Sequence, residues 1–366
     1  MGIVAMKKIK RFHRIVPGHV VIISIFLIFI SCPAVAVSAE TKTDQDVEYE
    51  AGFYYTVKPG DTLWDISQRF SDSPWQWPDL WRENEQLPNP HWIYPGERIR
   101  LFRKTEKDRQ PIAKKEEPKP EPKVAVAVPA EQPEPEVHYF YSRMNRVGFI
   151  RKPPVKPNGE IFKALEDKQL ISIDDVVYLK DTQGGPISDL TPGSRWTLYR
   201  TMAPTEDKKA TEMIGTQHYL VGALEVTQNE GQYAIAKVFN SYHNIQVGDL
   251  IMPYKDSVPE IAVSDSTSDI IGKIIASEDH TELIGEQVIA FIDKGEQDSI
   301  LPGQIYSIFE QETAMLGSAN KEAVLLKPVE LGSLIVLHTE LTTSTVLIID
   351  AKRKITPNTR IRTPGY

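Results

Sequence analysis

The sequence predicts an α+β module of order β-α-α-β, followed by a mainly-β region of two repeated small barrel- or sandwich-like modules. Two observations carry this prediction. Helical periodicity is concentrated in a tryptophan-rich stretch after residue 60, whereas the second half of the chain consists of short β-type runs broken by Gly, Pro and polar turns. The length of 366 residues allows two or three domains at roughly 150 residues each.

The first 39 residues are typical of a secretory signal peptide. A basic segment from Lys7 to Arg14 precedes an apolar run from Val20 to Ile30 and a small-residue stretch that ends at Ala39. Cleavage after Ala39 would place the mature chain in the periplasm or cell envelope. Two alternatives stay open: an uncut membrane anchor over residues 20–37, and lipidation of Cys32, the single cysteine of the chain.

Charge patterning argues against nucleic acid as a partner. The net charge is −8, and both signs are mixed along the chain without a basic stripe. Such a surface offers no cluster of cations to displace counterions from phosphates or to attract anionic lipid. We therefore expect no nucleic-acid partner, and membrane contact only if the N-terminal segment stays uncleaved.

Residues 53–103 contain the helical part of the chain. A short strand at residues 55–57 ends at the turn Lys58-Pro59-Gly60-Asp61, where Pro and Gly favour a tight turn. Thr62 with Asp65 three residues later predicts a capping box and the start of a helix. One apolar face of that helix is formed by Leu63, Ile66 and Phe70.

A second helix is predicted to begin at Pro78 and to run through Trp81 toward Asn84, because proline is favoured in the first helical turn. Pro95-Gly96 then leads into a strand at residues 98–102. Five of the six tryptophans fall between residues 64 and 92. In so small a domain we expect three of them in the core and two in loops: Trp64, Trp77 and Trp81 in the core, and Trp75 and Trp92 in loops.

This stretch resembles the LysM (lysin motif) family, in its tryptophan-rich bacterial envelope variant. The matching elements are Tyr55-x-Val57, Gly60-Asp61-Thr62-Leu63, Ile66, Phe70, Leu80-Trp81, Asn84, Ile93 and Pro95-Gly96. The resemblance implies a β-α-α-β fold over residues 55–102. It also implies binding of glycans that contain N-acetylglucosamine, in bacteria chiefly peptidoglycan, or a chitin-like oligosaccharide.

In that family the glycan lies in a shallow groove between the loop after the first strand and the loop before the last. The corresponding candidate ligand-binding residues are Gly60, Asp61, Thr62, Leu63, Asn89, Pro90, His91, Trp92 and Ile93. A glycine leaves room for a sugar, amides at a helix start can donate to an N-acetyl carbonyl, and an aromatic ring can pack on a pyranose. Exposed hydrogen bonds contribute about 1 kcal/mol each, so one such groove should bind weakly.

Residues 104–137 predict an extended, solvated linker. They are rich in Lys, Glu and Ala and contain seven prolines between Pro111 and Pro135, a composition that cannot bury enough apolar surface to offset the entropy of ordering. We expect this linker to hold two bodies apart.

The remaining chain predicts two copies of one β-module, at residues 138–255 and 262–366. Pro192-Gly193 and Pro302-Gly303 introduce similar strands, and the same spacings lead from Gly193 to Gly222 and from Gly303 to Gly332. One larger sandwich with chance spacing stays open as an alternative. Within this half, only the segment at residues 162–170 predicts a short helix.

Three functions remain compatible with these residues: a non-catalytic peptidoglycan-binding protein, a cell-wall hydrolase anchored by the first module, and a scaffold for envelope, secretion or pilus assembly. The mature chain would lack cysteine, and its histidines form no metal motif. We therefore expect no catalytic residue, no metal and no cofactor, although a pair of distant carboxylates leaves no signature. Residues 138–366 are expected to reach an envelope protein partner.

Overall fold

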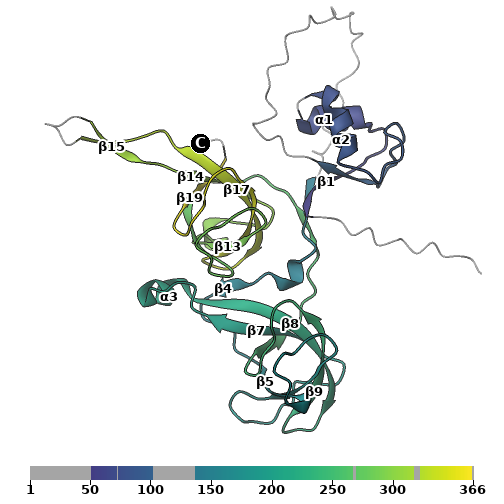
Figure 1. Cartoon of the computed structure of the whole chain (residues 1–366), viewed down its shortest axis with the longest axis vertical. Helices are drawn as coiled ribbons and strands as arrows, with labels where there is room; N and C mark the ends of the chain where they lie inside the picture. Colours follow the sequence, from purple (N-terminus) through teal and green to yellow (C-terminus); the bar gives the residue numbers. More distant parts are fainter. Residues whose placement is uncertain (1–50, 72, 102–136, 267–268, 317–321, 365–366) are drawn as a thin grey trace, which may run out of the picture. The chain divides into compact units, whose positions relative to one another are not determined.

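The computed structural model describes residues 51–71, 73–101, 137–266, 269–316 and 322–364 (Figure 1). The expected signal peptide, the anchor and lipidation alternatives, and the expected linker up to residue 136 lie outside these ranges. Within them, no helix has the length and apolar character needed to span a bilayer.

The N-terminal module has the predicted β-α-α-β order. Thr62 begins the first helix as expected, because its Oγ1 accepts the N–H of Asp65 at 3.2 Å. Strand β1 pairs antiparallel with β2. The elements are β1 (Gly52–Thr56), α1 (Leu63–Ser71), a 3₁₀ turn η1 (Pro74–Gln76), α2 (Trp77–Arg82) and β2 (Arg98–Leu101).

The buried side chain of Asn84 joins α2 to the sheet of this module. Its Nδ2 donates to the carbonyl oxygens of Leu80 at 2.6 Å and Arg100 at 3.0 Å, and its Oδ1 accepts the N–H of Arg100 at 2.7 Å. The amide thus bonds to β2 as another strand would. Around it, the core contains Tyr55, Val57, Leu63, Ile66, Leu80, Leu87 and Ile99.

The other edge of β1 pairs with a strand beyond the expected linker. Strand β3 (Val137–Phe140) pairs antiparallel with β1 and also with β11 (Glu260–Ala262), which gives a four-stranded sheet of order β11-β3-β1-β2. Arg98 on β2 also forms an ion pair with Glu260 on β11 at 2.5 Å. The expectation that the linker holds two separate bodies apart is therefore wrong: main-chain pairing joins them.

The rest of the chain forms two closed six-stranded barrels with the same ring order. Barrel 1 closes in the order β5-β6-β9-β8-β7-β10, and barrel 2 in the order β12-β13-β18-β17-β14-β19. The predicted repeat is confirmed, and the alternative of one larger sandwich is wrong. The strands of barrel 1 are β5 (Gly159–Ala164), β6 (Val176–Lys180), β7 (Arg195–Met202), β8 (Thr216–Asn229), β9 (Ala234–Ser241) and β10 (Leu250–Pro253). Those of barrel 2 are β12 (Ile271–Ser277), β13 (Ile289–Ile292), β14 (Ile305–Glu310), β17 (Val329–Thr339), β18 (Ser344–Ala351) and β19 (Arg360–Arg362).

Each barrel carries an insertion after its third strand. In barrel 1 it contains helix α3 (Lys208–Ile214), and in barrel 2 the hairpin of β15 (Thr313–Leu316) and β16 (Glu322–Leu325). Short 3₁₀ turns complete the described elements: η3 (Met144–Arg146), η4 (Leu165–Asp167) and η5 (Glu296–Asp298).

The helix expected at residues 162–170 is absent from this part of the structure, which has β5 and the turn η4 there instead. The pairing of β5 with β6 shifts register between Ile161 and Lys163. This bulge turns Ile161 and Ala164 to the core, and both are buried. Two core residues three positions apart imitate the spacing of a helix.

A glycine at the same place in each barrel lets two strands cross closely. Gly222 on β8 pairs with β9, and Gly332 on β17 pairs with β18. A Cβ at Gly222 would lie 2.5 Å from the carbonyl oxygen of Asn240, and one at Gly332 would lie 2.0 Å from that of Asp350. Next to each glycine, the pairing with β7 or β14 has a register shift that leaves one extra residue on the glycine's own strand, Val221 or Leu331.

Strand β4 (Phe149–Arg151) connects the two barrels. It pairs antiparallel with β8 of barrel 1. Two hydroxyl groups of barrel 2 donate to carbonyl oxygens at its other side: Thr343 to Ile150 at 2.7 Å and Thr345 to Gly148 at 2.8 Å. The guanidinium of Arg151 also forms a two-pronged ion pair with Glu340, with both N···O distances at 2.7 Å.

Glu278 of barrel 2 is buried at this junction, with 4 % of its surface exposed. Its Oε1 accepts the N–H of Gly148 at 2.9 Å. Burial raises the pKa of the Glu278 carboxyl to about 7, although the hydrogen bond from Gly148 opposes this shift.

Replacing Gly332 by Ala should destabilise barrel 2, because the added Cβ meets main chain that cannot move aside alone. Overpacking of this kind costs about 1–3 kcal/mol, so the melting temperature of the full chain should fall by several degrees. Gly285→Ala is the matched control, since nothing lies within 4 Å of its Cβ position. Equal calorimetric transitions for both variants would contradict the close crossing.

Glu278→Gln should stabilise the chain at pH 8 and have little effect near pH 4. The folded carboxyl has a pKa of about 7 against an ordinary value of 4.5, so the folded state binds the extra proton. The contribution of Glu278 to stability therefore falls as pH rises from about 4.5 to about 7, by on the order of 3 kcal/mol. Urea unfolding at both pH values measures this, with the exposed Glu282→Gln as control. A gain that is independent of pH would contradict it.

Candidate functional site

A pocket of about 230 Å³ lies in the N-terminal module, between the start of α1 and the loop before β2. Six of its lining residues are candidates from the sequence, and two are tryptophans that we expected in the core. The lining residues are Asp61, Thr62, Leu63, Trp64, Trp77, Pro90, His91 and Ile93.

The turn between β1 and α1 is fixed by the carboxylate of Asp61. Its Oδ2 accepts the hydroxyl of Tyr55 at 2.6 Å and the N–H of Lys58 at 2.8 Å, and Arg69 lies 3.6 Å from its Oδ1. Burial and the hydrogen bond to Asp61 raise the pKa of Tyr55, so the phenol stays neutral and keeps donating. Asp61 therefore positions the wall of the pocket, and its own oxygens are already occupied.

The start of α1 supplies main-chain donors at the pocket. The first N–H groups of a helix have no acceptor within the helix. The cap Thr62 satisfies that of Asp65, which leaves those of Leu63 and Trp64 without an intrahelical acceptor. Both residues line the pocket, so their amides can donate to a ligand carbonyl, such as that of an N-acetyl group.

Aromatic side chains form the apolar wall of the pocket. Trp64 is 38 % exposed, and its ring lies 4.8 Å from that of Trp75, which is 76 % exposed. On the other side, the ring of Trp77 lies 6.2 Å from His91. Indole faces at the rim of a pocket can pack on the C–H surface of a sugar ring.

The loop before β2 is ordered by short hydrogen bonds of its own residues. The Oδ1 of Asn89 accepts the N–H of His91 at 3.0 Å, and its carbonyl oxygen accepts the N–H of Trp92 at 3.1 Å. Asn89 thus shapes the loop that presents Pro90, His91 and Ile93 to the pocket.

Three of the nine sequence candidates lie outside the lining: Gly60, Asn89 and Trp92. Gly60 has a φ of 92°, a conformation that favours glycine, so its role is in the turn. Trp92 is 64 % exposed. Asp61, Thr62, Leu63, Pro90, His91 and Ile93 are brought together as the sequence predicted.

Trp64 and Trp77 are the two lining residues that sequence reasoning did not place in the groove. The core prediction is wrong for Trp64, whereas Trp77 and Trp81 are partly buried against the core. Trp81 also donates its Nε1–H to the carbonyl oxygen of Leu87 at 2.9 Å. The helical periodicity could have predicted the exposure of Trp64, because Trp64 follows Leu63 directly and so lies off the apolar face of α1.

Comparison with known proteins agrees with this geometry. Residues 55–102 match the family described as "LysM domain". These residues form a LysM domain. The chain is also 35% identical over 57 residues to the uncharacterized protein YqbP of Bacillus subtilis (strain 168). The matched segment covers 13% of this chain and 26% of YqbP. The match thus spans about a quarter of that relative.

LysM domains bind peptidoglycan and other glycans that contain N-acetylglucosamine, and the pocket offers amide donors and indole faces suited to such a ligand. Within the described ranges, no group of three or more His, Cys, Asp or Glu side chains could hold a metal ion.

Trp64→Ala should weaken glycan binding by about fivefold, because loss of one indole contact of this kind costs about 1 kcal/mol. The helix should stay intact, since alanine is a good helix former at an exposed position. Trp92→Ala is the matched control, because Trp92 is exposed but does not line the pocket.

Titration of the full chain with chitin oligomers, followed by NMR or calorimetry, measures both variants of the LysM domain. If Trp92→Ala lost affinity while Trp64→Ala kept it, the groove would lie on the other side of the loop before β2.

Proposed function

We propose that this chain is a non-catalytic glycan-binding protein of the bacterial cell envelope, which holds its two β-barrels at peptidoglycan. The observation that supports this proposal most is the pocket of the LysM domain. Main-chain donors at the start of α1 and the rings of Trp64 and Trp77 meet there in a shallow depression of about 230 Å³. The predicted signal peptide at residues 1–39 would bring the chain to the periplasm, where the ligand is.

The pairing of β1 with β3 connects the LysM domain directly to the rest of the chain. Since β1 of the LysM domain pairs directly with β3, a glycan held in the pocket is connected to the rest of the chain through a sheet. A fragment that ends before residue 137 loses this pairing. Tests of function are therefore best made on the whole chain.

A cell-wall hydrolase anchored by the LysM domain is the rival from a different class. LysM is a binding domain, so catalysis would have to reside in the barrels. The rival predicts that the chain releases soluble fragments from peptidoglycan, whereas our proposal predicts binding without turnover.

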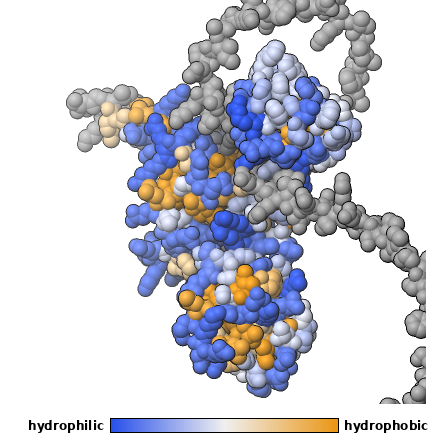
Figure 2. Space-filling view, turned by 45° about the vertical axis from the view of Figure 1, so that its right-hand side comes forward, coloured by the Kyte–Doolittle hydropathy of each residue, from blue (hydrophilic) through white to orange (hydrophobic). Residues whose placement is uncertain are grey.

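A scaffold for envelope assembly is the second candidate, and the surface of barrel 1 favours it. Figure 2 shows hydrophobic residues exposed on this barrel. The exposed apolar residues of this barrel include Phe162, whose ring lies 6.2 Å from Tyr178 and 6.5 Å from Tyr233. Further exposed apolar residues of the same barrel are Leu165, Leu170 and Ile173. An apolar surface of this kind is typical of a contact with another protein.

Purified sacculi should sediment the full chain, and Trp64→Ala should reduce the bound fraction. Under the same conditions, the supernatant should contain no more muropeptide than a control without protein. Binding equal to that of an unrelated protein of similar charge would refute the proposed function. Release of fragments in proportion to time would establish the hydrolase instead.

A further inference from the structure

The two barrels can be compared position by position, because equivalent residues lie 110 positions apart. Gly193, Gly222 and Gly248 correspond to Gly303, Gly332 and Asn358, and all but the central pair have positive φ. The loop before the last strand also keeps its main-chain bonds. Val221 accepts two consecutive loop N–H groups in barrel 1, and its equivalent Leu331 does so in barrel 2.

In barrel 1 an ion pair occupies the space between the third strand and this loop. Asp249 accepts the N–H of Gln246 at 2.7 Å, which closes the turn. It also takes two hydrogen bonds from Arg200 on β7, at 2.8 and 3.0 Å. The same guanidinium donates to the carbonyl oxygen of Asn244 at 3.2 Å. Asp249 is 2 % exposed, so the pair is sealed on the side of the carboxylate.

In barrel 2 the two partners are replaced by residues that cannot pair. Thr359 takes the place of Asp249 and keeps the bond to the turn, since its Oγ1 accepts the N–H of Thr356 at 3.2 Å. Glu310 takes the place of Arg200. A hydroxyl and a carboxylate form no ion pair, so the contact between strand and loop that barrel 1 has is lost.

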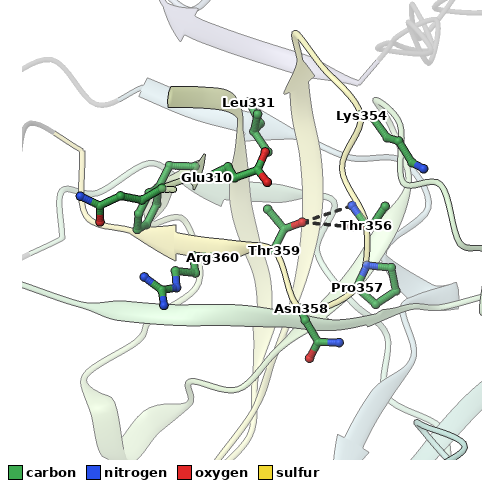
Figure 3. Close-up of a pocket in the computed structure, with 10 residues that line it drawn as sticks. Glu310, Leu331, Lys354, Thr356, Pro357, Asn358, Thr359 and Arg360 are labelled. Atoms are coloured by element: carbon green, nitrogen blue, oxygen red, sulfur yellow. Dashed lines mark hydrogen bonds between the residues drawn. The ribbon is translucent and has the colours of Figure 1, made fainter. Parts of the chain in front are cut away.

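A cavity of about 480 Å³ lies at this position in barrel 2 (Figure 3). Its apolar side includes Phe309, Leu331 and Pro357, and its polar side carries both signs of charge. The full lining is Phe309, Glu310, Gln311, Leu331, Lys354, Thr356, Pro357, Asn358, Thr359 and Arg360. Cavities of about 300–1,000 Å³ are the size that binds small molecules.

Three charged side chains at this cavity have no partner of opposite charge within the described residues: Glu310, Lys354 and Arg360. In Figure 3 the carboxylate of Glu310 is drawn near Thr359, and Lys354 and Arg360 lie toward opposite sides of the view, with their charged ends pointing outward. A cation bound beside Glu310 would take the place that the guanidinium of Arg200 has in barrel 1. Lys354 and Arg360 are both exposed, so a side-chain rotation of either one would bring its cation to the carboxylate of the same ligand.

We propose that this cavity of barrel 2 binds a small zwitterion of the amino-acid or short-peptide class. Glu310 receives its ammonium group, and Lys354 or Arg360 its carboxylate. Barrel 1 lacks this site, because Arg200 and Asp249 pair with each other there. The chemistry fits free peptides and equally the peptide stems that peptidoglycan glycans carry. This site is separate from the LysM pocket and does not rest on glycan binding there.

The double variant Glu310→Arg/Thr359→Asp transfers the barrel 1 ion pair into barrel 2. It should fill the cavity without unfolding the barrel. Its melting temperature should equal or exceed that of the natural chain. Glu282→Gln, an exposed residue outside the lining, changes the net charge by the same amount and is the matched control. Glu310→Gln is a milder variant that removes only the charge that receives the ammonium.

Three probes distinguish the sources in calorimetric titration of the full chain: the free alanyl-glutamyl-diaminopimelate tripeptide, a disaccharide bearing that peptide, and chitobiose without peptide. The peptide-bearing probes should bind the natural chain and the control. The transferred ion pair should abolish binding of the free tripeptide and reduce that of the disaccharide-peptide to the level of chitobiose, and Glu310→Gln should weaken tripeptide binding at least fivefold. Chitobiose binding should respond to Trp64→Ala and not to these variants.

Binding of the free tripeptide alone would support the site with free peptides as its source, and tighter binding of the disaccharide-peptide than of chitobiose would support it with the wall as its source. The proposal is overturned if the free tripeptide does not bind the natural chain and the disaccharide-peptide binds no more tightly than chitobiose. It is equally overturned if the transferred ion pair folds but leaves their affinity unchanged. Chitobiose binding is read separately, so failure of the LysM pocket does not decide this result.

Discussion

The close crossing of two strands at a glycine is the constraint on which both barrels depend. Gly222 and Gly332 face main-chain carbonyl oxygens at distances that no side chain tolerates. A six-stranded sheet can close only if its longest strands bend sharply, and the bend brings main chain against main chain at one point. Register shifts beside the glycines, with Val221 and Leu331 as the extra residues, occur at the same place in both copies. Both barrels therefore keep a glycine and a register shift at the position where the main chain leaves no room for a side chain.

The two barrels share their strand order and the positions of their turns, and they differ in the side chains at their exposed ends. The turn before the last strand keeps a side-chain acceptor in both copies, as Asp249 in barrel 1 and Thr359 in barrel 2. What differs is the residue across from it, Arg200 or Glu310. Together with the change from Asp249 to Thr359, this exchange replaces the ion pair of barrel 1 by an open, charged cavity in barrel 2. Barrel 1 thus shows which contact between strand and turn is missing in barrel 2.

In the LysM domain, the same residues that hold the fold also build the groove. Asp61 locks the turn through Tyr55 and Lys58, and Thr62 caps α1 through Asp65. Both contacts consume side-chain oxygens and leave main-chain amides at the pocket. Under the proposed function, recognition would rely on backbone donors and indole faces, so that a small domain could carry a ligand site without a buried charged group.

The sequence by itself determined the elements that depend on local chemistry. Capping at Thr62 and the proline at the start of α2 follow from short-range rules and predicted the β-α-α-β order. The resemblance of the motif implied the LysM fold, and the equal spacing of Gly and Pro predicted the repeat. The sequence also predicted six of the eight residues that line the LysM pocket. Tertiary structure alone decided the rest. A bulge at Ile161 gave β5 two core residues with helical spacing. Trp64 lies at the pocket and not in the core, and β1 pairs with β3 as its second neighbour. Each of these depends on which strand edge or surface a residue meets across the fold, and a linear pattern carries no record of that neighbour.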